Sequence, residues 1–292
     1  MFINLLKAMR PKQWAKNIFI FVPLVFDRKL FNVPSLLTTL AGIGVFCLLA
    51  STIYLINDLS DLEADRQHPR KRYRPIASGA LSTNSARNAV ILLLIICLPA
   101  AYLIDFGFFI TCFIYMASNF LYSKWIKHTP LLDVLFLAGF YVIRVSAGVT
   151  LIEVERFSPW LYIFTTFLAL YLGIGKRRAE LSQLSGEASI TRRVLDGYTI
   201  NFLDNLTLLV SGIAIITYSL YTFTAPNLPE NHSMMLTIPF VIYAIFRYLY
   251  LIQVVNIGDI PEDIFYTDRP LQVCMLLWGA TVFIVFYVLP ML

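Results

Sequence analysis

Nine long apolar segments fill most of the 292-residue chain, and they constrain its fold more than any other feature. A helix needs about 20 mostly apolar residues to cross the hydrocarbon core of a bilayer. Backbone groups in lipid must be hydrogen-bonded within helices or closed barrels. The sequence therefore predicts an all-α integral membrane protein of about nine transmembrane helices, at residues 14–33, 35–57, 84–104, 106–123, 131–151, 158–177, 200–223, 234–255 and 270–290.

The composition agrees with a membrane protein. Hydrophobic residues make up 58% of the chain and charged residues 14%, whereas soluble domains are about 45–50% apolar and about 25% charged. The four cysteines lie within apolar runs and form no C-x-x-C pair, which favours buried hydrophobic side chains over metal ligands or disulfides. Because the net charge of +5 comes from basic residues between apolar segments, we expect a bilayer partner and no nucleic acid.

The distribution of Lys and Arg predicts the orientation. With the N-terminus inside, the inner segments hold most of these residues, and the outer segments hold only Arg28, Lys29 and Arg156. The positive-inside rule then places the N-terminus in the cytoplasm. The span at 14–33 is the weakest, because charged residues shorten its apolar run, and a tight turn is expected near Asp105. No second domain is evident, so we expect residues 1–292 to form one membrane domain.

The richest charged stretch is NDLSDLEADRQHPRKRYRPIASG, at residues 57–79. Asp58, Asp61 and Asp65 are spaced by three and four residues, which places them on one stripe of a helix. Three carboxylates repel one another unless a cation lies among them, and Mg²⁺ commonly bridges carboxylates to substrate phosphates. We therefore predict catalytic carboxylates at Asp58, Asp61 and Asp65, and Mg²⁺ ligands at Asn57, Asp58, Asp61 and Asp65.

Basic residues follow these acids directly. Arg binds phosphate through two parallel hydrogen bonds, and Lys adds a compact positive charge. A solvated loop that obeys the positive-inside rule is the alternative, although acids contribute little to topology. We interpret the run as a polyphosphate-binding segment and predict substrate contacts at Arg66, His68, Lys71, Arg72 and Arg74, with Arg70 in the same run.

A second set of charged residues lies further along the chain. Asp133 begins a predicted helix, where the helix dipole favours an acid, and Arg144 lies inside a predicted span, where an ionisable group is costly. Each has a structural alternative: a helix start for Asp133, an internal pair for Arg144, and an ordinary helix pair for Glu180. With these alternatives open, we predict substrate-binding residues at Tyr122, Lys127, Asp133, Arg144, Lys176, Arg177 and Glu180, and at Lys12 and Lys16 near the N-terminus.

The motif N-D-x-x-D-x-x-x-D, complete from Asn57 to Asp65, and the run RPIASG resemble the UbiA-type intramembrane prenyltransferase superfamily. The resemblance covers nearly the whole chain. It implies nine helices around a central cavity that opens near the cytoplasmic surface, and Mg²⁺ as cofactor. The chain departs from that pattern after the sixth span, where KRRAEL stands in place of a second Asp-rich motif.

One branch of this superfamily, the decaprenyl-phosphate phosphoribosyltransferases, is similar at RPKQWAKN, DRQHPRKRYRPIASG, YSKWIK, KRRAEL and DRPLQ. That resemblance implies transfer of 5-phosphoribose from phosphoribosyl pyrophosphate to a polyprenyl monophosphate, with release of pyrophosphate. It also implies a role in making the lipid-linked precursor of cell-wall arabinan, at a site on the cytoplasmic face of the cell membrane.

Under this resemblance Asp58 and Asp61 hold Mg²⁺, with support from Asn57 and Asp65. Lys71, Arg72 and Arg74 contact the donor phosphates. Five further residues are candidates for binding either the lipid phosphate or the ribose 5-phosphate: Lys12, Lys16, Lys127, Lys176 and Arg177. Two alternatives remain: prenyl transfer from a prenyl diphosphate to an aromatic acceptor, and a membrane transporter. The concentration of charge at one membrane face argues against the transporter, and the oligomeric state stays open.

Overall fold

The computed structural model describes residues 2–69, 71–154, 158–184, 193–255, 264–265 and 267–291; Arg70 and Arg156 lie outside these ranges. Every regular element in this described part is a helix, which confirms the all-α prediction. The chain forms two compact units, one of Met1–Lys124 with Ile143–Val154 and the other of Trp125–Val142 with Glu155–Leu292. Helix α7 (Leu132–Thr150) contributes to both units, and each unit is described by itself.

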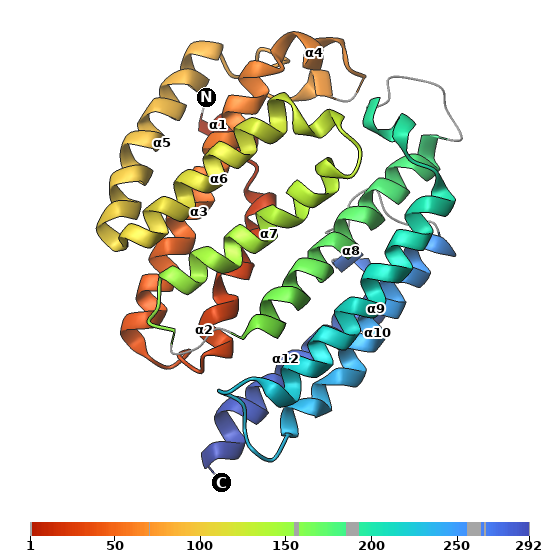
Figure 1. Ribbon diagram of the computed structural model, residues 1–292. Coiled ribbons are helices and arrows are strands. Elements are labelled where there is room, and N and C mark those ends of the chain that lie inside the picture. Colours follow the sequence, from red (N-terminus) through yellow and green to blue (C-terminus); the bar gives the residue numbers. More distant parts are fainter. Residues whose placement is uncertain are drawn as a thin grey trace. The chain divides into compact units, whose positions relative to one another are not determined.

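Helix α3 (Val33–Ser60) is the centre of the first unit (Figure 1). It packs against α1 (Phe2–Met9), α5 (Thr83–Ile104) and α6 (Phe106–Lys124). The buried core at one end of α3 joins this helix to α1 and α5 through small and aliphatic side chains. Its buried members are Ala8, Met9, Leu55, Ile76, Leu81 and Ala86.

A single residue separates α5 from α6, as the sequence predicted. Asp105 has an extended backbone and ends α5, and its Oδ1 accepts the N–H of Phe108 at 2.8 Å in the first turn of α6. This contact satisfies one of the N–H groups that a helix start leaves without a partner. The side chain therefore starts α6 directly after the chain reverses.

The predicted span at 14–33 is not one continuous α-helix. Residues Pro11–Phe21 form a 3-10 helix of 11 residues, and α2 (Val22–Phe26) adds 5. The chain then leaves the helical conformation at Arg28, whose φ is 57°. Neither piece reaches the roughly 20 residues of a straight crossing. Pro23 and the charged run at 27–29 lie in this stretch and disfavour a continuous helix.

The 3-10 segment packs very closely against α7. A Cβ atom at Gly148 would lie 2.2 Å from the carbonyl oxygen of Ile20. No other residue type fits there without a shift of the backbone, because Gly alone lacks a Cβ. Gly148 therefore sets the distance between α7 and this segment.

In the second unit α8 (Pro159–Leu184) and α9 (Ile200–Thr224) form the most extensive helix pair of the described part. Helix α10 (Ile238–Gln253) contacts both, and α12 (Arg269–Phe283) packs on α10 and continues into a π-helical turn. The buried aromatic rings of Tyr171 and Tyr248 lie 5.2 Å apart in this core. Side chains begin two of these helices, because Thr199 caps α9 and Asp268 caps α12.

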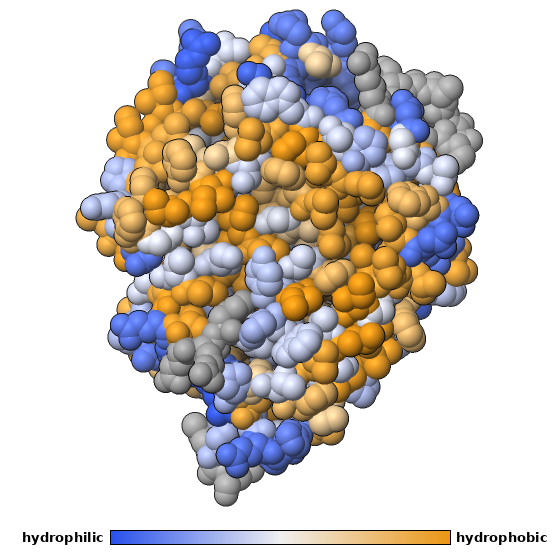
Figure 2. All heavy atoms as spheres, in the orientation of Figure 1, coloured by the Kyte–Doolittle hydropathy of each residue, from blue (hydrophilic) through white to orange (hydrophobic). Residues whose placement is uncertain are grey.

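Seven helices among the described residues are long and apolar enough to cross a membrane. Their outer faces carry large apolar side chains, and such side chains cover most of the face in Figure 2. Leu103 is 82% exposed and Leu276 is 73% exposed, which is favourable in lipid and unfavourable in water. The protein is thus an integral membrane protein, with candidate spans Val33–Ser60, Thr83–Ile104, Phe106–Lys124, Leu132–Thr150, Ile200–Thr224, Ser233–Gln253 and Arg269–Val288.

Two of the nine predicted spans are not among these seven. One is 14–33, described above. The other, 158–177, corresponds to the first part of α8, whose 26 residues exceed the length of a crossing. The last part of α8 carries the charged run KRRAEL, which makes this helix less apolar than the seven.

Candidate active site

The acids of the motif at residues 57–65 lie where α3 ends and α4 (Leu62–Gln67) begins. Asp58 occupies the last turn of α3, and Asp65 lies in α4. Asp61 sits between them with φ −94° and ψ 12°, so the helix is interrupted there. Asp58 and Asp65 are 3% and 1% exposed. Buried carboxylates require cations or hydrogen-bond donors close by.

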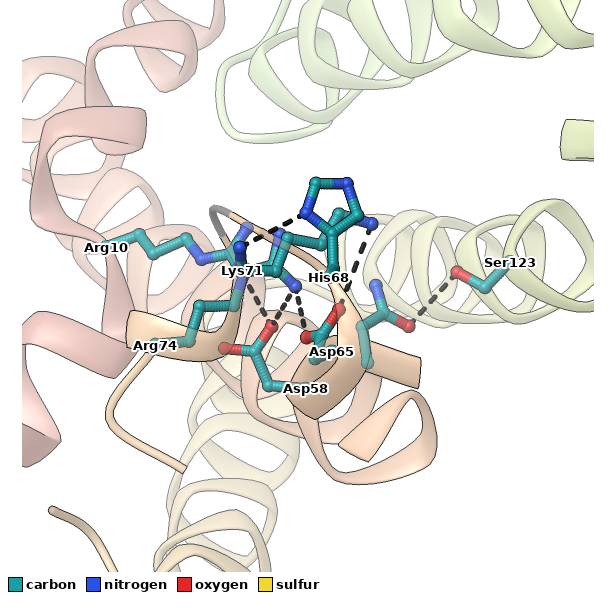
Figure 3. A network of polar contacts seen from close by, with 8 residues as sticks. Arg10, Asp58, Asp65, His68, Lys71, Arg74 and Ser123 are labelled. Atoms are coloured by element: carbon teal, nitrogen blue, oxygen red, sulfur yellow. Dashed lines mark hydrogen bonds and ion pairs between the residues drawn. The ribbon is translucent and has the colours of Figure 1, made fainter. Parts of the chain in front are cut away.

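Three basic side chains supply this compensation (Figure 3). Arg74 Nη1 lies 3.1 Å from Asp58 Oδ1 and 2.6 Å from Asp65 Oδ2, so one guanidinium bridges both acids. Arg10 Nη2 lies 2.5 Å from Asp58 Oδ1, and Lys71 Nζ lies 3.8 Å from Asp65 Oδ1. We call these five residues the carboxylate cluster. Its basic groups bring phosphate-binding chemistry into direct contact with the acids.

Arg10 is the member that the site prediction missed. Its backbone is left-handed, with φ 55° and ψ 61°, a conformation that costs an ordinary L-residue roughly 1–2 kcal/mol. Pro11 follows and disfavours a right-handed helical conformation at Arg10. The guanidinium carbon lies 4.8 Å from the centre of the Tyr54 ring, a cation–π contact that stabilises the positive charge. The pair with Asp58 joins residues 48 positions apart, and no local pattern predicts such a contact.

The cluster also has oxygen atoms suited to a hard cation. Asp58 Oδ2 is buried and accepts no hydrogen bond from any residue that the structure describes. Asn57 Oδ1 accepts the Ser123 hydroxyl at 3.0 Å, which orients its amide. No group of three or more His, Cys, Asp or Glu side chains within the described ranges forms a ready metal site. Mg²⁺ often uses one or two carboxylates and takes its other ligands from water and substrate phosphate, and these residues fit that pattern.

Three further basic residues of the same run make other contacts. Arg66 is exposed and pairs with Glu63 at 3.0 Å. Arg72 donates to the Tyr73 hydroxyl at 2.8 Å, also at the surface. His68 Nδ1 accepts the backbone N–H of Lys71 at 3.3 Å and closes the local turn. The structure thus brings Lys71 and Arg74 to the carboxylates, but not Arg66 or Arg72.

Arg144 is held inside the first unit. It is 5% exposed, and it donates to Asn17 Oδ1 at 2.9 Å and to the Tyr115 hydroxyl at 3.1 Å. Its guanidinium carbon lies 5.1 Å from the Tyr115 ring centre. These contacts join α7 to the 3-10 segment and to α6. The internal pairing that the sequence left open is therefore the arrangement observed.

A second cluster of charges lies in the second unit. Arg177 Nε lies 2.6 Å from Asp133 Oδ2, and its Nη1 lies 2.5 Å from Glu180 Oε2. Arg177 and Asp133 are both 0% exposed. Tyr198, which the sequence reading did not single out, donates its hydroxyl to Asp133 Oδ1 at 2.7 Å. Burial raises the pKa of Tyr198 and its hydrogen bond to Asp133 raises it further, so the phenol stays protonated as a donor.

The remaining predicted residues occupy more accessible positions. Lys12 is exposed on the 3-10 segment. The others are half-buried, and Lys16 is close enough to influence Tyr115 electrostatically. They are Lys16 in the 3-10 segment, Tyr122 near the end of α6, Lys127 in the short 3-10 helix Ile126–His128, and Lys176 in α8.

Bacterial proteins called decaprenyl-phosphate phosphoribosyltransferase are similar to this chain over nearly its whole length. Decaprenyl-phosphate phosphoribosyltransferase of Corynebacterium glutamicum is 31% identical over 295 aligned positions, which cover 99% of this chain and 88% of that protein. The protein of the same name from Mycobacterium tuberculosis is 32% identical over 283 residues, which cover 96% of this chain and 93% of that protein.

The fold has a counterpart among solved structures. A UbiA homologue from Archaeoglobus fulgidus, solved with DMAPP and Mg²⁺, matches with a TM-score of 0.73 at 20% identity and covers 98% of this chain and 100% of that one. At that identity the match shows the fold alone. The model of the UbiA prenyltransferase family matches residues 19–260. The chain therefore belongs to the UbiA prenyltransferase family and is a membrane-embedded transferase of that family.

Proposed function

We propose that this transferase moves 5-phosphoribose from phosphoribosyl pyrophosphate to a decaprenyl-like polyprenyl monophosphate and releases pyrophosphate. The two similar proteins named decaprenyl-phosphate phosphoribosyltransferase support this substrate pair. The observation that carries the proposal is the carboxylate cluster. There, Arg10 and Arg74 contact Asp58 directly, so anion-binding and cation-binding groups meet at one place.

A donor with a diphosphate leaving group suits such a site. Asp58, Asp61, Asp65 and Asn57 would hold Mg²⁺, which would neutralise the charge that develops on the leaving pyrophosphate. Arg10, Lys71 and Arg74 would bind the phosphate oxygens through charge-assisted hydrogen bonds. These basic groups hold the leaving group in place and so orient C1 of the ribose toward the acceptor.

The transfer breaks one bond at ribose C1 and forms another. The bond between ribose C1 and the pyrophosphate oxygen breaks, and the electron pair leaves with pyrophosphate. Positive charge develops at C1 as in other glycosyl transfers. An oxygen of the lipid phosphate then forms a new bond to C1 from the opposite face. Since that acceptor is already an anion, the chain needs no general base, and its task is to position two anionic substrates.

Basic residues outside the cluster would bind the two phosphates that are not part of the leaving group. Lys12, Lys16, Lys127 and Lys176 are candidates for the lipid phosphate or the ribose 5-phosphate, and Tyr122 is a candidate for a neutral contact. Support comes from their charge and their exposed or half-buried positions. Exposed Arg66 and Arg72, and His68 in the turn, would add positive potential that attracts the donor.

The membrane arrangement belongs to the same proposal. Helix α8 and the residues 11–26 would add two crossings to the seven candidate spans and give nine. The distribution of Lys and Arg supports a cytoplasmic N-terminus and a site at the cytoplasmic face of the cell membrane. The family match, which includes parts of both units, supports one membrane domain over residues 1–292. The product would serve as a lipid-linked precursor of cell-wall arabinan.

Prenyl transfer to an aromatic acceptor is the alternative within the family. The solved homologue with bound DMAPP favours a prenyl diphosphate donor for that protein. In the present chain, three bases and one acid in KRRAEL replace the acids expected of a second prenyl-diphosphate motif. This replacement favours the phosphoribosyl donor.

A direct comparison of donors tests the proposal. Purified protein with Mg²⁺ is given either labelled phosphoribosyl pyrophosphate with polyprenyl phosphate, or labelled geranyl diphosphate with 4-hydroxybenzoate. Label from phosphoribosyl pyrophosphate in the lipid product supports phosphoribosyl transfer. Product from the prenyl pair alone supports the alternative, and uptake into proteoliposomes without covalent product would support a transporter.

A further inference from the structure

One stripe of α3 contacts the segment 9–17, which precedes this helix in the chain. The members of the stripe are spaced by four, three and four residues, which places them within about 60° of one another around the helix axis. They are Cys47, Ser51, Tyr54 and Asp58, and each contacts a residue of the segment. The segment runs antiparallel to α3, because its later residues contact the earlier members of the stripe.

Ser51 is the member of the stripe that makes contacts on both sides of Arg10. Its hydroxyl accepts the indole N–H of Trp14 at 2.9 Å and donates toward the carbonyl oxygen of Met9 at 3.0 Å. Ser51 is 0% exposed, and Trp14 packs against the buried core that includes Met9. A buried hydroxyl needs partners of this kind. One side chain of α3 therefore holds both the backbone just before Arg10 and the side chain four residues after it.

Arg10 depends on such support because of its backbone conformation. The residue is left-handed, with φ 55° and ψ 61°, and a residue other than glycine keeps this conformation only where its surroundings hold it there. Its carbonyl oxygen accepts the N–H of Gln13 at 2.9 Å, which closes the bend. The guanidinium then passes the ring of Tyr54 and reaches Asp58 (Figure 3). The bend at Arg10 thus determines where its guanidinium lies in the carboxylate cluster.

The far end of the segment is attached separately. Asn17 Nδ2 donates to Cys47 Sγ at 3.1 Å, and Asn17 Oδ1 accepts Nε of Arg144 at 2.9 Å. Cys47 lies about three turns of α3 before Asp58. Ser51 lies between these two positions on the stripe, so the contacts of Ser51 and Trp14 are the ones closest in sequence to the bend at Arg10.

We propose that Ser51 and Trp14 are positioning residues, which hold the bend at Arg10 against α3 so that its guanidinium binds the diphosphate of the donor beside Asp58. A buried hydrogen-bonded contact favours one geometry, because a displaced polar group would lose its partner. Ser51 and Trp14 act through Arg10 and do not touch the substrate. The inference rests on the proposed function for the identity of the donor.

Binding of pyrophosphate tests this role, because pyrophosphate is the leaving group of either candidate donor. Calorimetric titration with Mg²⁺ and pyrophosphate gives a dissociation constant for each purified variant in detergent. The variants are Ser51→Ala, Trp14→Phe and Arg10→Gln, and each of the first two combined with Arg10→Gln. KM for phosphoribosyl pyrophosphate, KM for polyprenyl phosphate and kcat are measured on the same proteins, with a thermal midpoint to verify folding.

The expected result is a specific loss of diphosphate binding. We expect Ser51→Ala and Trp14→Phe each to raise the dissociation constant of pyrophosphate about fivefold, which is the loss of about 1 kcal/mol. The KM for phosphoribosyl pyrophosphate should rise by a similar factor, whereas the KM for polyprenyl phosphate should change by less than about twofold. In the Arg10→Gln background either substitution should add less than about twofold, because contacts that act through one residue are not additive.

Two variants serve as matched controls. Thr52→Val removes a buried hydroxyl from the next position of α3, where Thr52 Oγ1 lies 2.9 Å from the carbonyl oxygen of Leu48. Ser51 Oγ lies 2.9 Å from the carbonyl oxygen of Cys47 in the same way, so this control accounts for the contact within the helix. Trp278→Phe removes an indole N–H that donates within the second unit. Both controls should keep the dissociation constant of pyrophosphate within about twofold of the wild type.

Three results would overturn the inference. If Ser51→Ala and Trp14→Phe lower the thermal midpoint but leave the dissociation constant of pyrophosphate unchanged, the contacts only stabilise the fold. If either substitution keeps its full effect in the Arg10→Gln background, that residue does not act through Arg10. If Ser51→Ala does not fold, Trp14→Phe decides the question, because it keeps an aromatic side chain at a half-buried position; an unchanged dissociation constant in that variant contradicts the role.

The proposed function is judged separately, by the product that the wild-type protein makes. Wild-type protein that transfers only a prenyl group would refute phosphoribosyl transfer. The titrations with pyrophosphate would then still decide whether Ser51 and Trp14 position Arg10, since a prenyl diphosphate has the same leaving group.

Discussion

At the scale of single residues, the two charged clusters differ in what their arginines contact. In the carboxylate cluster, Arg74 bridges Asp58 and Asp65, and the side chains of Arg10 and Arg74 are each 29% exposed. In the second cluster, Arg177 and Asp133 are both fully buried. A partly exposed guanidinium can exchange a carboxylate for a phosphate, whereas a fully buried one cannot do so without a large desolvation cost. We therefore propose that the donor binds at the first cluster.

Arg10 provides the first prediction, because only the structure places it beside Asp58. Arg10→Gln removes a charge-assisted hydrogen bond, which is worth about 1.5–3 kcal/mol. We expect the KM for phosphoribosyl pyrophosphate to rise about 10- to 100-fold, with a smaller change in kcat. Steady-state kinetics of lipid labelling measure both values. The matched control is Arg66→Gln, because Arg66 pairs with exposed Glu63; an equal effect of both variants would contradict a specific contact.

These residues also show what sequence reasoning can reach. Asp58 and Asp65 belong to a motif of fixed spacing, so the sequence alone identified both as candidate site residues. The pairing of Asp58 with Arg10 joins residues 48 positions apart, and the pairing of Tyr198 with Asp133 joins residues 65 positions apart. Such contacts depend on how helices pack and leave no local pattern in the sequence. Burial is likewise a tertiary property, so the sequence did not show that Arg177 is enclosed together with Asp133.

At the scale of secondary structure, the chain begins with short helical pieces instead of a straight span. The 3-10 segment Pro11–Phe21 carries Asn17, which Arg144 of α7 holds by a hydrogen bond. Gly148 of α7 allows the two elements to approach closely. This packing positions the segment that follows Arg10, and so connects element packing to the carboxylate cluster.

Gly148→Ala tests this contact between elements. The added methyl group would lie 2.2 Å from the Ile20 carbonyl oxygen, so we expect a lower thermal midpoint in detergent. Gly139→Ala is the matched control on the same helix, since its Cβ would meet nothing within 4 Å. Ala is favoured over Gly by roughly 0.5–1 kcal/mol in a helix, so this control should be unchanged or more stable. A midpoint that falls equally in both variants would show that helix propensity, and not close packing, is responsible.

The start of α12 gives a prediction of pH dependence. Asp268 accepts the Leu271 N–H at 2.9 Å and pairs with Arg247 at 2.8 Å. Its hydrogen bond from Arg247 is the main cause that lowers the pKa of Asp268. A lowered pKa in the folded state means that the stabilisation is present above the ordinary pKa near 4 and is lost as the pH falls through the folded value.

Asp268→Asn keeps a good helix cap and removes the charge. We expect the wild-type protein to have the higher thermal midpoint at pH 7, and the difference to shrink as the pH is lowered from about 5 toward 3. Thermal unfolding of both proteins across this range measures the difference. A gap that stays constant down to pH 3 would show that the charge of Asp268 does not contribute.

At the scale of the whole molecule, the length and apolarity of the segments were enough to predict an all-α membrane protein. Seven of the predicted spans are helices that could cross a membrane. The predicted span at 14–33 is a 3-10 helix followed by a short α-helix, and hydropathy alone does not reveal such a conformation or a close contact such as that at Gly148. The motif at residues 57–65 carried the family assignment, which the family model over residues 19–260 confirms.

The most direct test of the account is metal-dependent phosphoribosyl transfer by two matched carboxylate variants. Asp58 belongs to the carboxylate cluster and is buried, whereas Glu63 lies a few residues away, exposed and paired with Arg66. Label from phosphoribosyl pyrophosphate in the lipid fraction is measured for the wild type, Asp58→Asn and Glu63→Gln, with Mg²⁺ and with excess EDTA. We predict label for the wild type and Glu63→Gln that EDTA abolishes, and at least a hundredfold loss for Asp58→Asn. Full labelling by Asp58→Asn, or labelling that survives EDTA, would contradict the account.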